Sequence, residues 1–364
     1  MKIVLTGGGT GGHAYPAIGI AEALRSDPKH RSSVDLLYLG GKGRIEETLA
    51  NEAGIPFVGL PSRKLGRALS LGNLKAVFTL GRGFTEALCE LNRFNPDLVI
   101  GTGGYVSASV IMAQAVRRGK ILIHEQNVVP GRTNLWLSRY TTRICVTFED
   151  SLIYFPKAKT VETGLPIRSD LLHLPDKQEA RKTLGLVEGR FTLLVLGGSQ
   201  GARKLNEVAA DSIPQLRETP IQVLHQAGPR NFDEANRRRE EAGWEHYHVK
   251  AYIDDMKSAY AASDLVLSRS GASTVAEITV AGLPAIYVPY PFAYADHQRY
   301  NGEFVARNGG GKVINESDLS SAMLVEMIKR LIDSPDELAR MAESSRKLGK
   351  PNAARDIAEI VFEM

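Results

Sequence analysis

The chain has 364 residues, of which 43% are apolar and 24% charged, and its formal net charge is +4. This composition excludes a disordered or fibrous chain, and the length exceeds that of one typical hydrophobic core, so two domains are expected. Two cysteines, Cys89 and Cys145, fit no metal or disulfide spacing, and we expect both to be buried in a reducing cytoplasm. No signal peptide is expected, because Met1-Lys2 leads straight into a strand-length apolar run.

Strand-length apolar runs alternate with helix-length stretches along the chain. The first half has predicted strands at 3–5, 34–39, 98–100, 121–124, 144–147 and 160–162, and a helix at Pro16–Arg25 with its proline in the first turn. After a linker at Gly164-Leu165-Pro166, further strands are predicted at 192–196, 222–226, 246–250, 265–267, 285–289 and 311–314. The alternation predicts an α/β fold with two parallel sheets, each covered by helices on both faces. The charged tail from Pro335 is expected to form terminal helices with a break near Gly349–Pro351.

Two long stretches carry no charge, residues 98–116 and 278–295. Their glycines, prolines and polar residues favour buried parallel-sheet segments over membrane-spanning helices. Charge is uneven between the halves, with a net +7 over residues 1–163 and −3 over residues 164–364. A basic first half indicates a polyanionic partner, such as nucleic acid, anionic lipid or a phosphorylated substrate.

Two glycine-rich loops are the most informative motifs. Thr6-Gly7-Gly8-Gly9-Thr10-Gly11-Gly12-His13 follows the first predicted strand, and Gly197-Gly198-Ser199-Gln200-Gly201-Ala202-Arg203 follows the strand at 192–196. A strand, a tight glycine turn and a helix start bring backbone N–H groups to a phosphate. Each half is therefore expected to hold an anionic ligand.

The first loop also satisfies the dinucleotide-binding spacing Gly7-x-Gly9-x-x-Gly12. That motif needs an acid at the end of the second strand, but here the strand ends in Gly40-Gly41-Lys42 and Asp35 lies near its start, which disfavours a dehydrogenase. His13 lies at the mouth of the loop. It is either a helix-start histidine bonded to backbone or a catalytic group, and its place beside the glycines favours the second reading.

Five motifs in order resemble one family over most of the chain, as far as about Asn301. They are Gly8–His13, Gly101–Ser107, His124-Glu125-Gln126-Asn127, Gly197–Arg203 and Arg269–Glu277. Together they resemble the MurG family, the UDP-N-acetylglucosamine (UDP-GlcNAc):lipid I N-acetylglucosaminyltransferases of bacterial peptidoglycan synthesis. The resemblance implies a GT-B fold, with two Rossmann-like domains facing an interdomain cleft, and inverting transfer to the 4-hydroxyl of N-acetylmuramic acid. It implies an acceptor and membrane-associating domain at 1–163, a donor domain at 164–340, and a terminal helix at 341–364 that crosses back.

Departure of UDP leaves negative charge on a diphosphate. Many glycosyltransferases neutralise it with a metal held by Asp-x-Asp, a triplet that this sequence lacks. We therefore expect no cofactor and no protein-held metal, with backbone dipoles at helix starts taking that role. Ser199, the amides of 198–202, and Ser270–Ser273 before a helix at Thr274 suit it, and the resemblance adds Arg168.

The resemblance further implies the donor contacts. Ile253 has a backbone that reads uracil, and Glu277 binds the ribose hydroxyls, although Thr274-x-x-Glu277 is also a capping box. Gln298, with His297 as the weaker candidate, would read the sugar hydroxyls through its amide. The full set of predicted UDP-GlcNAc-binding residues is Thr10, Gly11, Gly12, Asn127, Arg168, Ser199, Gln200, Gly201, Ile253, Ser273, Thr274, Glu277, His297 and Gln298.

The acceptor hydroxyl must lose its proton as it attacks. His13 is the leading candidate for the base and Glu125 the second, although Glu125 could instead order its own loop. The acceptor diphosphate is expected to lie against the two glycine loops of the first half, at Gly8, Gly9, Gly103, Gly104 and Tyr105.

Residues 61–85 carry five basic residues and no acid. If 73–91 is helical, Val77, Leu80, Phe84, Leu88 and Leu91 form an inward stripe. A second apolar set beside two cations suits an anionic bilayer, and this predicted membrane face comprises Leu71, Leu74, Lys75, Phe78 and Arg82. A buried helix with a solvated basic rim is the alternative. If this segment is a membrane face, the protein attaches peripherally to the cytoplasmic face of the plasma membrane. The expected partners are then UDP-GlcNAc, lipid I, anionic lipid and other cell-wall enzymes.

Three other functions compete with this reading. A UDP-GlcNAc 2-epimerase shares the architecture but needs no lipid site. A glycosyltransferase acting on diacylglycerol or a small natural product would differ in the first half, where Gly103-Gly104-Tyr105 discriminates. A non-enzymatic nucleotide-sugar-binding or scaffold protein is the third. Nucleic-acid binding has little support, because the basic segment lacks a groove-reading motif.

Overall fold

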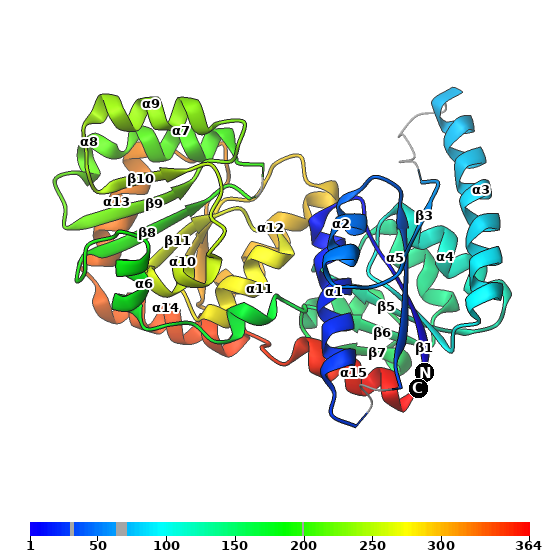
Figure 1. Ribbon diagram of the computed structural model, residues 1–364. Helices are drawn as coiled ribbons and strands as arrows, with labels where there is room; N and C mark the ends of the chain where they lie inside the picture. Colours follow the sequence, from blue (N-terminus) through cyan, green and yellow to red (C-terminus); the bar gives the residue numbers. More distant parts are fainter. Residues whose placement is uncertain (30–32, 63–70, 199) are drawn as a thin grey trace. The chain divides into compact units, whose positions relative to one another are not determined.

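The computed structural model describes residues 1–29, 33–62, 71–198 and 200–364, without the side chains of residues 71–77. It divides into two compact units, one of Met1–Arg168 with Pro351–Met364 and the other of Ser169–Lys350 (Figure 1). Each unit is a parallel sheet flanked by helices. The predicted α/β fold class with two parallel sheets is therefore confirmed.

The first unit has a seven-stranded parallel sheet in the order β3-β2-β1-β4-β5-β6-β7. Its strands are β1 (Lys2–Thr6), β2 (Asp35–Gly41), β3 (Phe57–Leu60), β4 (Leu98–Gly101), β5 (Lys120–Glu125), β6 (Arg143–Val146) and β7 (Thr160–Glu162). Its helices are α1 (Gly11–Ser26), α2 (Ile45–Glu52), α3 (Leu71–Phe94), α4 (Tyr105–Val116), α5 (Arg132–Leu137) and α15 (Ala353–Glu363), with 3₁₀ turns η1 (Ser138–Tyr140), η2 (Glu149–Tyr154) and η3 (Lys157–Lys159).

Both faces of this sheet are buried, which explains why its strands are continuous apolar runs. Successive side chains of β1 point to opposite faces. Ile3 and Leu5 pack with α1 and α15, whereas Val4 packs on the other face with α3 and α4. In register, Ile3 pairs with Leu36 on β2 and with Leu98 on β4.

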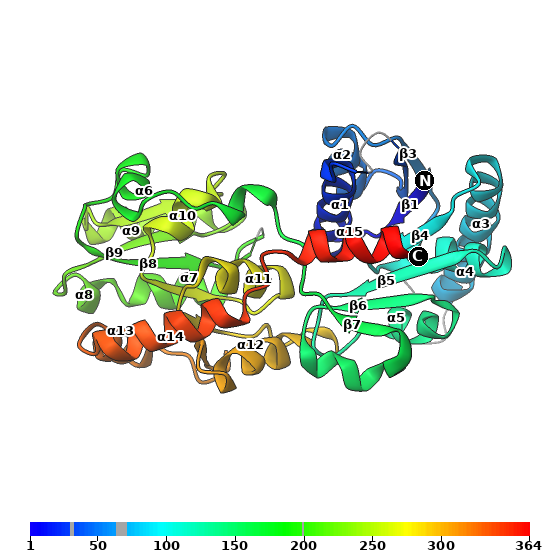
Figure 2. The ribbon, with the colours of Figure 1, turned by 90° about the horizontal axis from the view of Figure 1, so that it is seen from below.

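The last helix, α15, packs against α1 (Figure 2). Its apolar residues Ile357, Ala358 and Val361 are buried in the same core as Ile3. The preceding helix, α14, instead packs against α11 of the second unit. The observed division therefore differs from the expected one at residues 164–168 and 341–350, because only α15 has its apolar stripe in the first unit.

Two local expectations were wrong, and one strand was missed. The first helix begins at Gly11 rather than Pro16, because the carbonyl of Thr10 already accepts from the amides of His13 and Ala14, so the proline lies inside the helix. Strand β3 was not predicted, because it is a short edge strand that follows Pro56 and contains a glycine. Cys89 is exposed, since the inward positions of α3 are Ala87 and Leu91, while Cys145 is buried as expected.

The second unit has a six-stranded parallel sheet in the order β10-β9-β8-β11-β12-β13. Its strands are β8 (Phe191–Leu196), β9 (Ile221–Gln226), β10 (Tyr247–Lys250), β11 (Leu265–Ser268), β12 (Ala285–Tyr287) and β13 (Gly311–Val313). Its helices are α6 (Lys177–Thr183), α7 (Arg203–Asp211), α8 (Ile213–Leu216), α9 (Phe232–Ala242), α10 (Met256–Ala262), α11 (Ala272–Ala281), α12 (His297–Arg307), α13 (Ser321–Ile332) and α14 (Pro335–Leu348), with 3₁₀ turns η4 (Ser169–Leu172) and η5 (Tyr294–Asp296).

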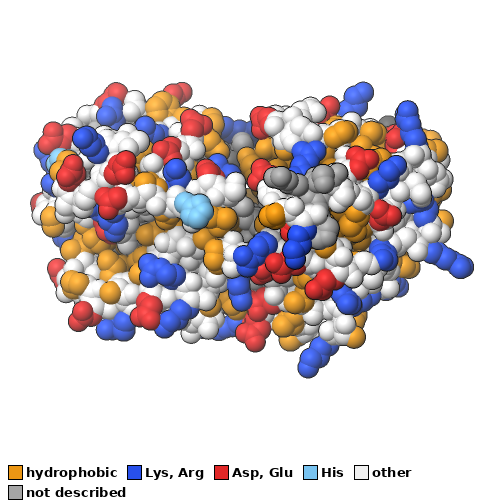
Figure 3. Space-filling view, turned by 60° about the horizontal axis from the view of Figure 1, so that its bottom comes forward, with side chains coloured by type: hydrophobic (Ala, Val, Ile, Leu, Met, Phe, Trp, Pro, Cys, Tyr) orange, Lys and Arg blue, Asp and Glu red, His pale blue; other side chains and the backbone are white. Residues whose placement is uncertain are grey.

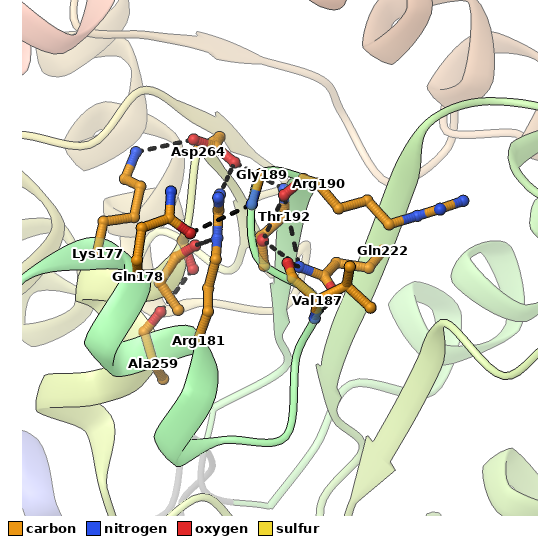
Figure 4. Close-up of polar contacts among 12 residues, drawn as sticks. Lys177, Gln178, Arg181, Val187, Gly189, Arg190, Thr192, Gln222, Ala259 and Asp264 are labelled. Atoms are coloured by element: carbon orange, nitrogen blue, oxygen red, sulfur yellow. Dashed lines mark hydrogen bonds and ion pairs between the residues drawn. The ribbon is translucent and has the colours of Figure 1, made fainter.

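A polar cluster ties α6 to the start of two strands in this unit (Figure 4). Oδ2 of Asp264, just before β11, accepts from Nη2 of Arg181 at 2.5 Å and from the amide of Thr192 at 2.7 Å, and its Oδ1 accepts from Nζ of Lys177 at 2.8 Å. The Arg181 side chain is only 4% exposed, so it has no access to water if its partner is removed. Beside this cluster, Gln222 exchanges two hydrogen bonds with the backbone of Val187.

We therefore expect Asp264→Ala to lower the free energy of unfolding of the second unit by about 3 kcal/mol. The substitution leaves the buried guanidinium of Arg181 without its carboxylate and the amide of Thr192 without its acceptor. The matched control is Asp211→Ala, which removes a surface partner of Arg238 and should cost less than about 1 kcal/mol. The chain has two tryptophans, and Trp244 is buried in the second unit. In a Trp136→Phe background, its fluorescence during urea titration reports this unit, and equal losses in the two variants would contradict the prediction.

Candidate active site

The candidate site of the first unit lies where the order of its strands reverses. Strand β1 has β2 on one side and β4 on the other, and the helices that follow β1 and β4, α1 and α4, pack on opposite faces of the sheet (Figure 1). Ligands of open α/β sheets bind at the carboxyl ends of the strands at such a switch point. Here these two loops are the glycine-rich segments Gly7–Gly12 and Thr102–Gly104.

The two loops are joined through their backbones. The amide of Thr102 donates to Thr6 O at 2.9 Å, that of Gly8 donates to Gly103 O at 3.2 Å, and Thr102 Oγ1 donates to His13 O at 2.6 Å. A Cβ on Gly104 would lie 2.3 Å from Gly8 O, and Gly104 has a φ of +90°. Only glycine fits there, because any side chain would push the loops apart.

A buried carboxylate that sequence reasoning missed also holds the first loop. Glu46 is 1% exposed, and it accepts from the amide of Gly9 at 3.0 and 3.2 Å and from the amide of Gly41 at 3.0 Å. Burial, aided by the charge of Glu46, raises the pKa of Tyr38, whose hydroxyl donates to Gly7 O at 2.7 Å. The sequence feature that could have pointed to Glu46 is its position, an acidic residue a few positions after Gly40-Gly41, the glycine pair that ends the second strand.

These contacts affect the predicted acceptor-diphosphate residues. The amides of Gly8 and Gly9 donate to protein oxygens, and the neighbouring carboxylate would repel a phosphate. The amides of Gly11 and Gly12 lie in the first turn of α1, where no preceding turn supplies a carbonyl and the helix dipole is positive. In this conformation an anion would meet Gly11 and Gly12 rather than Gly8 and Gly9.

His13 follows on the first turn of α1 and is half-buried. Its Nδ1 lies 3.0 Å from Thr102 O and 3.0 Å from Gln126 Oε1. Among the described residues, none forms a hydrogen bond with its Nε2. One ring nitrogen is thus held by the loop after β4 and the end of β5, and the other can meet a ligand.

Glu125, the second candidate for the base, is 1% exposed and binds its own loop. Its Oε1 accepts from the amide of Asn127 at 3.0 Å, and its Oε2 accepts from the amide of Gly131 at 3.1 Å and from Nδ2 of Asn134 at 2.8 Å. Of the two roles considered for Glu125, this geometry favours the structural one, in which Glu125 orders its own loop, over the role of base. Asn127 itself is half-buried and donates to Glu125 Oε1 at 3.4 Å.

Two further predicted site residues, Tyr105 and Arg168, also belong to this unit. Tyr105 begins α4 directly after the glycine pair and is 39% exposed. Arg168 is partly buried and is the last residue before the second unit begins.

The second unit repeats the arrangement at its own switch point, between β8 and β11. In the loop after β8, the amide of Gly201 donates to Gly198 O at 3.0 Å, and both glycines have positive φ. Gln200 is an exposed turn residue, and Ser199 lies outside the described residues. A Cβ on Gly201 would lie 2.0 Å from Ala227 O, so the loop packs closely against the end of β9.

Gln226, at the end of β9, links this loop to the predicted uracil-reading residue. Its Oε1 accepts from the amide of Ile253 at 2.9 Å, and its Nε2 lies 3.4 Å from Gly198 O. Ile253 is buried. A base at this position would therefore have to displace Gln226 or use the carbonyl of Ile253.

Helix α11 begins at Ala272 with Gly271 as its N-cap, two residues earlier than expected. Thr274 is therefore inside the helix, and the capping-box reading of Thr274-x-x-Glu277 is wrong. The Glu277 Oε2 instead accepts from the hydroxyl of Tyr260 at 2.8 Å, a buried residue of α10 that the sequence gave no reason to select. Ser273 and Thr274 lie in the first turn and are half-buried.

The predicted sugar-reading residues begin α12, next to the start of α11. Ser270 Oγ donates to Gln298 O at 2.7 Å, and the Oε1 of Gln298 accepts from the amide of Tyr290 at 3.0 Å. His297 Nδ1 donates to Tyr294 O at 2.8 Å. The preceding Ala295 and Asp296 both have left-handed φ angles, an unfavourable backbone for non-glycine residues that often marks a functional loop.

The predicted membrane face lies on α3. Phe78 is 78% exposed, and the side chain of Arg82 is 68% exposed and pairs with Glu86 at 2.7 Å. The side chains of Leu71, Leu74 and Lys75 lie outside the described residues. Across the described chain, no helix is both long and apolar enough to cross a membrane. Figure 3 shows one face of the whole molecule, on which Lys and Arg side chains are interspersed with Asp and Glu side chains.

Comparison with known proteins identifies the class. The glycosyltransferase family 28 N-terminal domain matches residues 3–146, and the family 28 C-terminal domain matches residues 192–359. Two parallel-sheet units with glycine loops at their switch points are thus those of a glycosyltransferase with the GT-B fold. A curated relative from Desulforamulus reducens, named UDP-N-acetylglucosamine–N-acetylmuramyl-(pentapeptide) pyrophosphoryl-undecaprenol N-acetylglucosamine transferase, is 41% identical over 99% of this chain and 98% of its own length.

The solved structure of Acinetobacter baumannii MurG is 28% identical, with a TM-score of 0.81 over 100% of this chain and 99% of that one. The chain belongs to the MurG family, as the motifs predicted. A UDP-GlcNAc 2-epimerase from Neisseria meningitidis aligns over 100% of both chains with a TM-score of 0.68, but at 16% identity it shares only the fold. Family membership therefore disfavours the epimerase alternative.

The contact between the two glycine loops can be tested through stability. We expect Gly104→Ala to lower the melting temperature by several degrees, because its Cβ meets Gly8 O and its φ is unfavourable, a cost of about 1–3 kcal/mol. The matched control is Gly12→Ala, where the nearest atom is Thr10 Oγ1 at 3.8 Å and the residue is helical. This variant should keep or raise the melting temperature in a thermal scan. Equal stability of the two variants would refute the close contact.

Proposed function

We propose that this chain transfers GlcNAc from UDP-GlcNAc to the 4-hydroxyl of N-acetylmuramic acid in undecaprenyl-pyrophosphoryl-MurNAc-pentapeptide (lipid I), giving lipid II. One observation carries the proposal: each unit has a glycine loop and a helix N-terminus at its switch point, in a chain 41% identical to a transferase named for this reaction. Two such sites suit a reaction in which both substrates carry a diphosphate.

The second unit would bind the donor. The N-terminal amides of α7 and α11, with Ser199, Gln200, Gly201, Ser273 and Thr274, would stabilise the diphosphate charge that grows as UDP leaves, and Arg168 would add a cation. Glu277, oriented by Tyr260, would accept hydrogen bonds from the ribose hydroxyls. The Ile253 backbone would read uracil, and Gln298 and His297 the sugar, with Asn127 and Thr10–Gly12 as further donor contacts.

The first unit would bind the acceptor. His13 would take the proton of the 4-hydroxyl as its oxygen attacks the anomeric carbon, the bond to UDP breaks, and the configuration inverts. Glu125 would keep the loop at 125–134 in place. The acceptor diphosphate would meet the turn at Gly103–Tyr105, with Gly8 and Gly9 shaping the neighbouring loop from behind.

The proposal includes no metal held by the protein. Among the described residues, no three His, Cys, Asp or Glu side chains converge as metal ligands, and Glu46 and Glu125 are engaged by backbone amides. Oriented helix dipoles would carry the charge of the leaving group instead.

A transfer assay with a short-chain lipid I analogue tests the function. We expect product with UDP-GlcNAc, a much lower rate with UDP-GalNAc, and an unchanged rate in excess EDTA. Absence of a lipid-linked disaccharide would refute the proposed reaction. Loss of activity in EDTA that Mg²⁺ restores would refute only the metal-free mechanism.

We also propose that α3 attaches the enzyme to the cytoplasmic face of the plasma membrane, where its lipid-linked acceptor resides. The exposed Phe78 would enter the interface, and Arg82, although its charge is partly offset by Glu86, would face anionic headgroups.

Substituting Phe78→Ser together with Arg82→Gln should weaken cosedimentation with phosphatidylglycerol vesicles at least about fivefold, since each interfacial cation contributes about 1 kcal/mol. The matched control is Ile153→Ser, which removes an equally exposed apolar side chain from η2 of the same unit. Binding that is lost equally in the control, or unchanged in both, would contradict attachment through α3.

A further inference from the structure

Gln126 belongs to the His124–Asn127 motif, and neither the resemblance nor the proposed reaction assigns it a role, yet it contacts the proposed base. Its side chain is 2% exposed and lies between His13 and His124. The inference drawn from it rests on the proposed role of His13 as the base.

The orientation of the Gln126 amide follows from its neighbours. Its Nε2 lies 2.8 Å from Thr102 O and 3.0 Å from His124 O, two oxygens that can only accept. Turning the amide over would place Oε1 against both carbonyls, so Nε2 must face them. The Oε1 then faces His13 Nδ1 at 3.0 Å.

His124 supports the same orientation. Its Nε2 lies 2.8 Å from Gly164 O, so that nitrogen must carry the proton and donate it. Burial lowers the pKa of His124 to about 4, so the ring is neutral at pH 7 and its Nδ1 is an acceptor. That Nδ1 lies 3.1 Å from Nε2 of Gln126, which has two N–H donors; one faces Thr102 O, and the other is shared between His124 Nδ1 and His124 O.

The chain of hydrogen bonds therefore ends at His13. Both atoms close to its Nδ1, Thr102 O and Gln126 Oε1, can only accept, so Nδ1 must carry a proton. In the neutral ring, the lone pair is then on Nε2, the nitrogen that no described residue bonds. A histidine acts as a base only through the nitrogen that is unprotonated.

We propose that Gln126 is a positioning residue that holds His13 in the Nδ1–H tautomer and so makes Nε2 the base. Its own orientation is set by His124, which the carbonyl of Gly164 holds in turn. Gln126 touches no substrate in this scheme and acts only through His13.

The tautomer can be read directly by NMR. In the full chain labelled with [¹⁵N]histidine, long-range ¹H–¹⁵N correlations distinguish Nδ1–H from Nε2–H, and His13→Gln assigns the signal by its disappearance. We expect the Nδ1–H pattern in the wild type. An Nε2–H pattern for His13 would overturn the proposal, whether or not the enzyme transfers GlcNAc to lipid I.

Two variants distinguish control of the His13 tautomer by Gln126 from a purely structural role of Gln126. Gln126→Leu removes one of the two acceptors that face His13 Nδ1 and leaves only Thr102 O. It should therefore increase the Nε2–H population and lower kcat about 10- to 100-fold. Gln126→Glu keeps an acceptor for Nδ1–H but loses the donors to Thr102 and His124, so it should be destabilised while retaining the tautomer and more of the activity. Activity that follows melting temperature rather than tautomer in these variants would overturn the proposal.

A double substitution provides the final check. His13→Ala should lower kcat about 10²- to 10⁴-fold with UDP affinity nearly unchanged. Because Gln126 acts through His13, adding Gln126→Leu to His13→Ala should cause no further loss of kcat. A further tenfold loss in the double variant would show an independent role and refute the proposal. Absence of transfer by the wild type would refute the proposed function alone.

Discussion

The structure of the first unit depends on a backbone-to-backbone contact between the loops after β1 and β4. The hydrogen bond from Gly8 to Gly103, and the approach of Gly104 to Gly8 O, leave no room for side chains. Because this contact fixes Thr102, it also fixes the carbonyl that accepts from His13. The sterics of glycine thus set the geometry of the proposed base, although the glycines themselves carry out no chemistry.

The second unit also places a glycine loop at the switch point of a parallel sheet, but different polar residues hold that loop. At its switch point the glycine loop packs on the end of β9 through Gly201, and Gln226 joins that loop to Ile253. In both units a buried amide side chain, Gln126 or Gln226, spans two loops at the carboxyl ends of the strands. A primary amide suits this place because it satisfies a donor and an acceptor at once without placing a charge beside a ligand phosphate.

The sequence predicted much of the fold because its signals are local. Apolar runs and glycine turns located every strand except β3, where a short edge strand between proline and glycine gives almost no pattern. The same signals located both glycine loops. They could not show which groups Glu46, Gln126 and Tyr260 bind, because each acts on a residue distant in the chain, and only the packing of separate elements brings such pairs together. The capping box at Thr274 shows the converse, since a spacing that fits a motif had no part in the actual helix start.

Glu46 explains why the first loop is not a dinucleotide site despite its spacing. In such a site the loop amides face a pyrophosphate, and an acid at the end of the second strand holds the ribose. Here the carboxylate follows the strand by a few residues and turns back onto the loop, where it bonds the amide of Gly9. The negative charge therefore lies against the loop amide of Gly9, where it would repel a phosphate. An incoming anion would instead meet the first-turn amides of α1, which directly precede the proposed base His13. This one buried acid would therefore both disfavour a cofactor phosphate at Gly9 and leave the amides next to the proposed base open to a substrate.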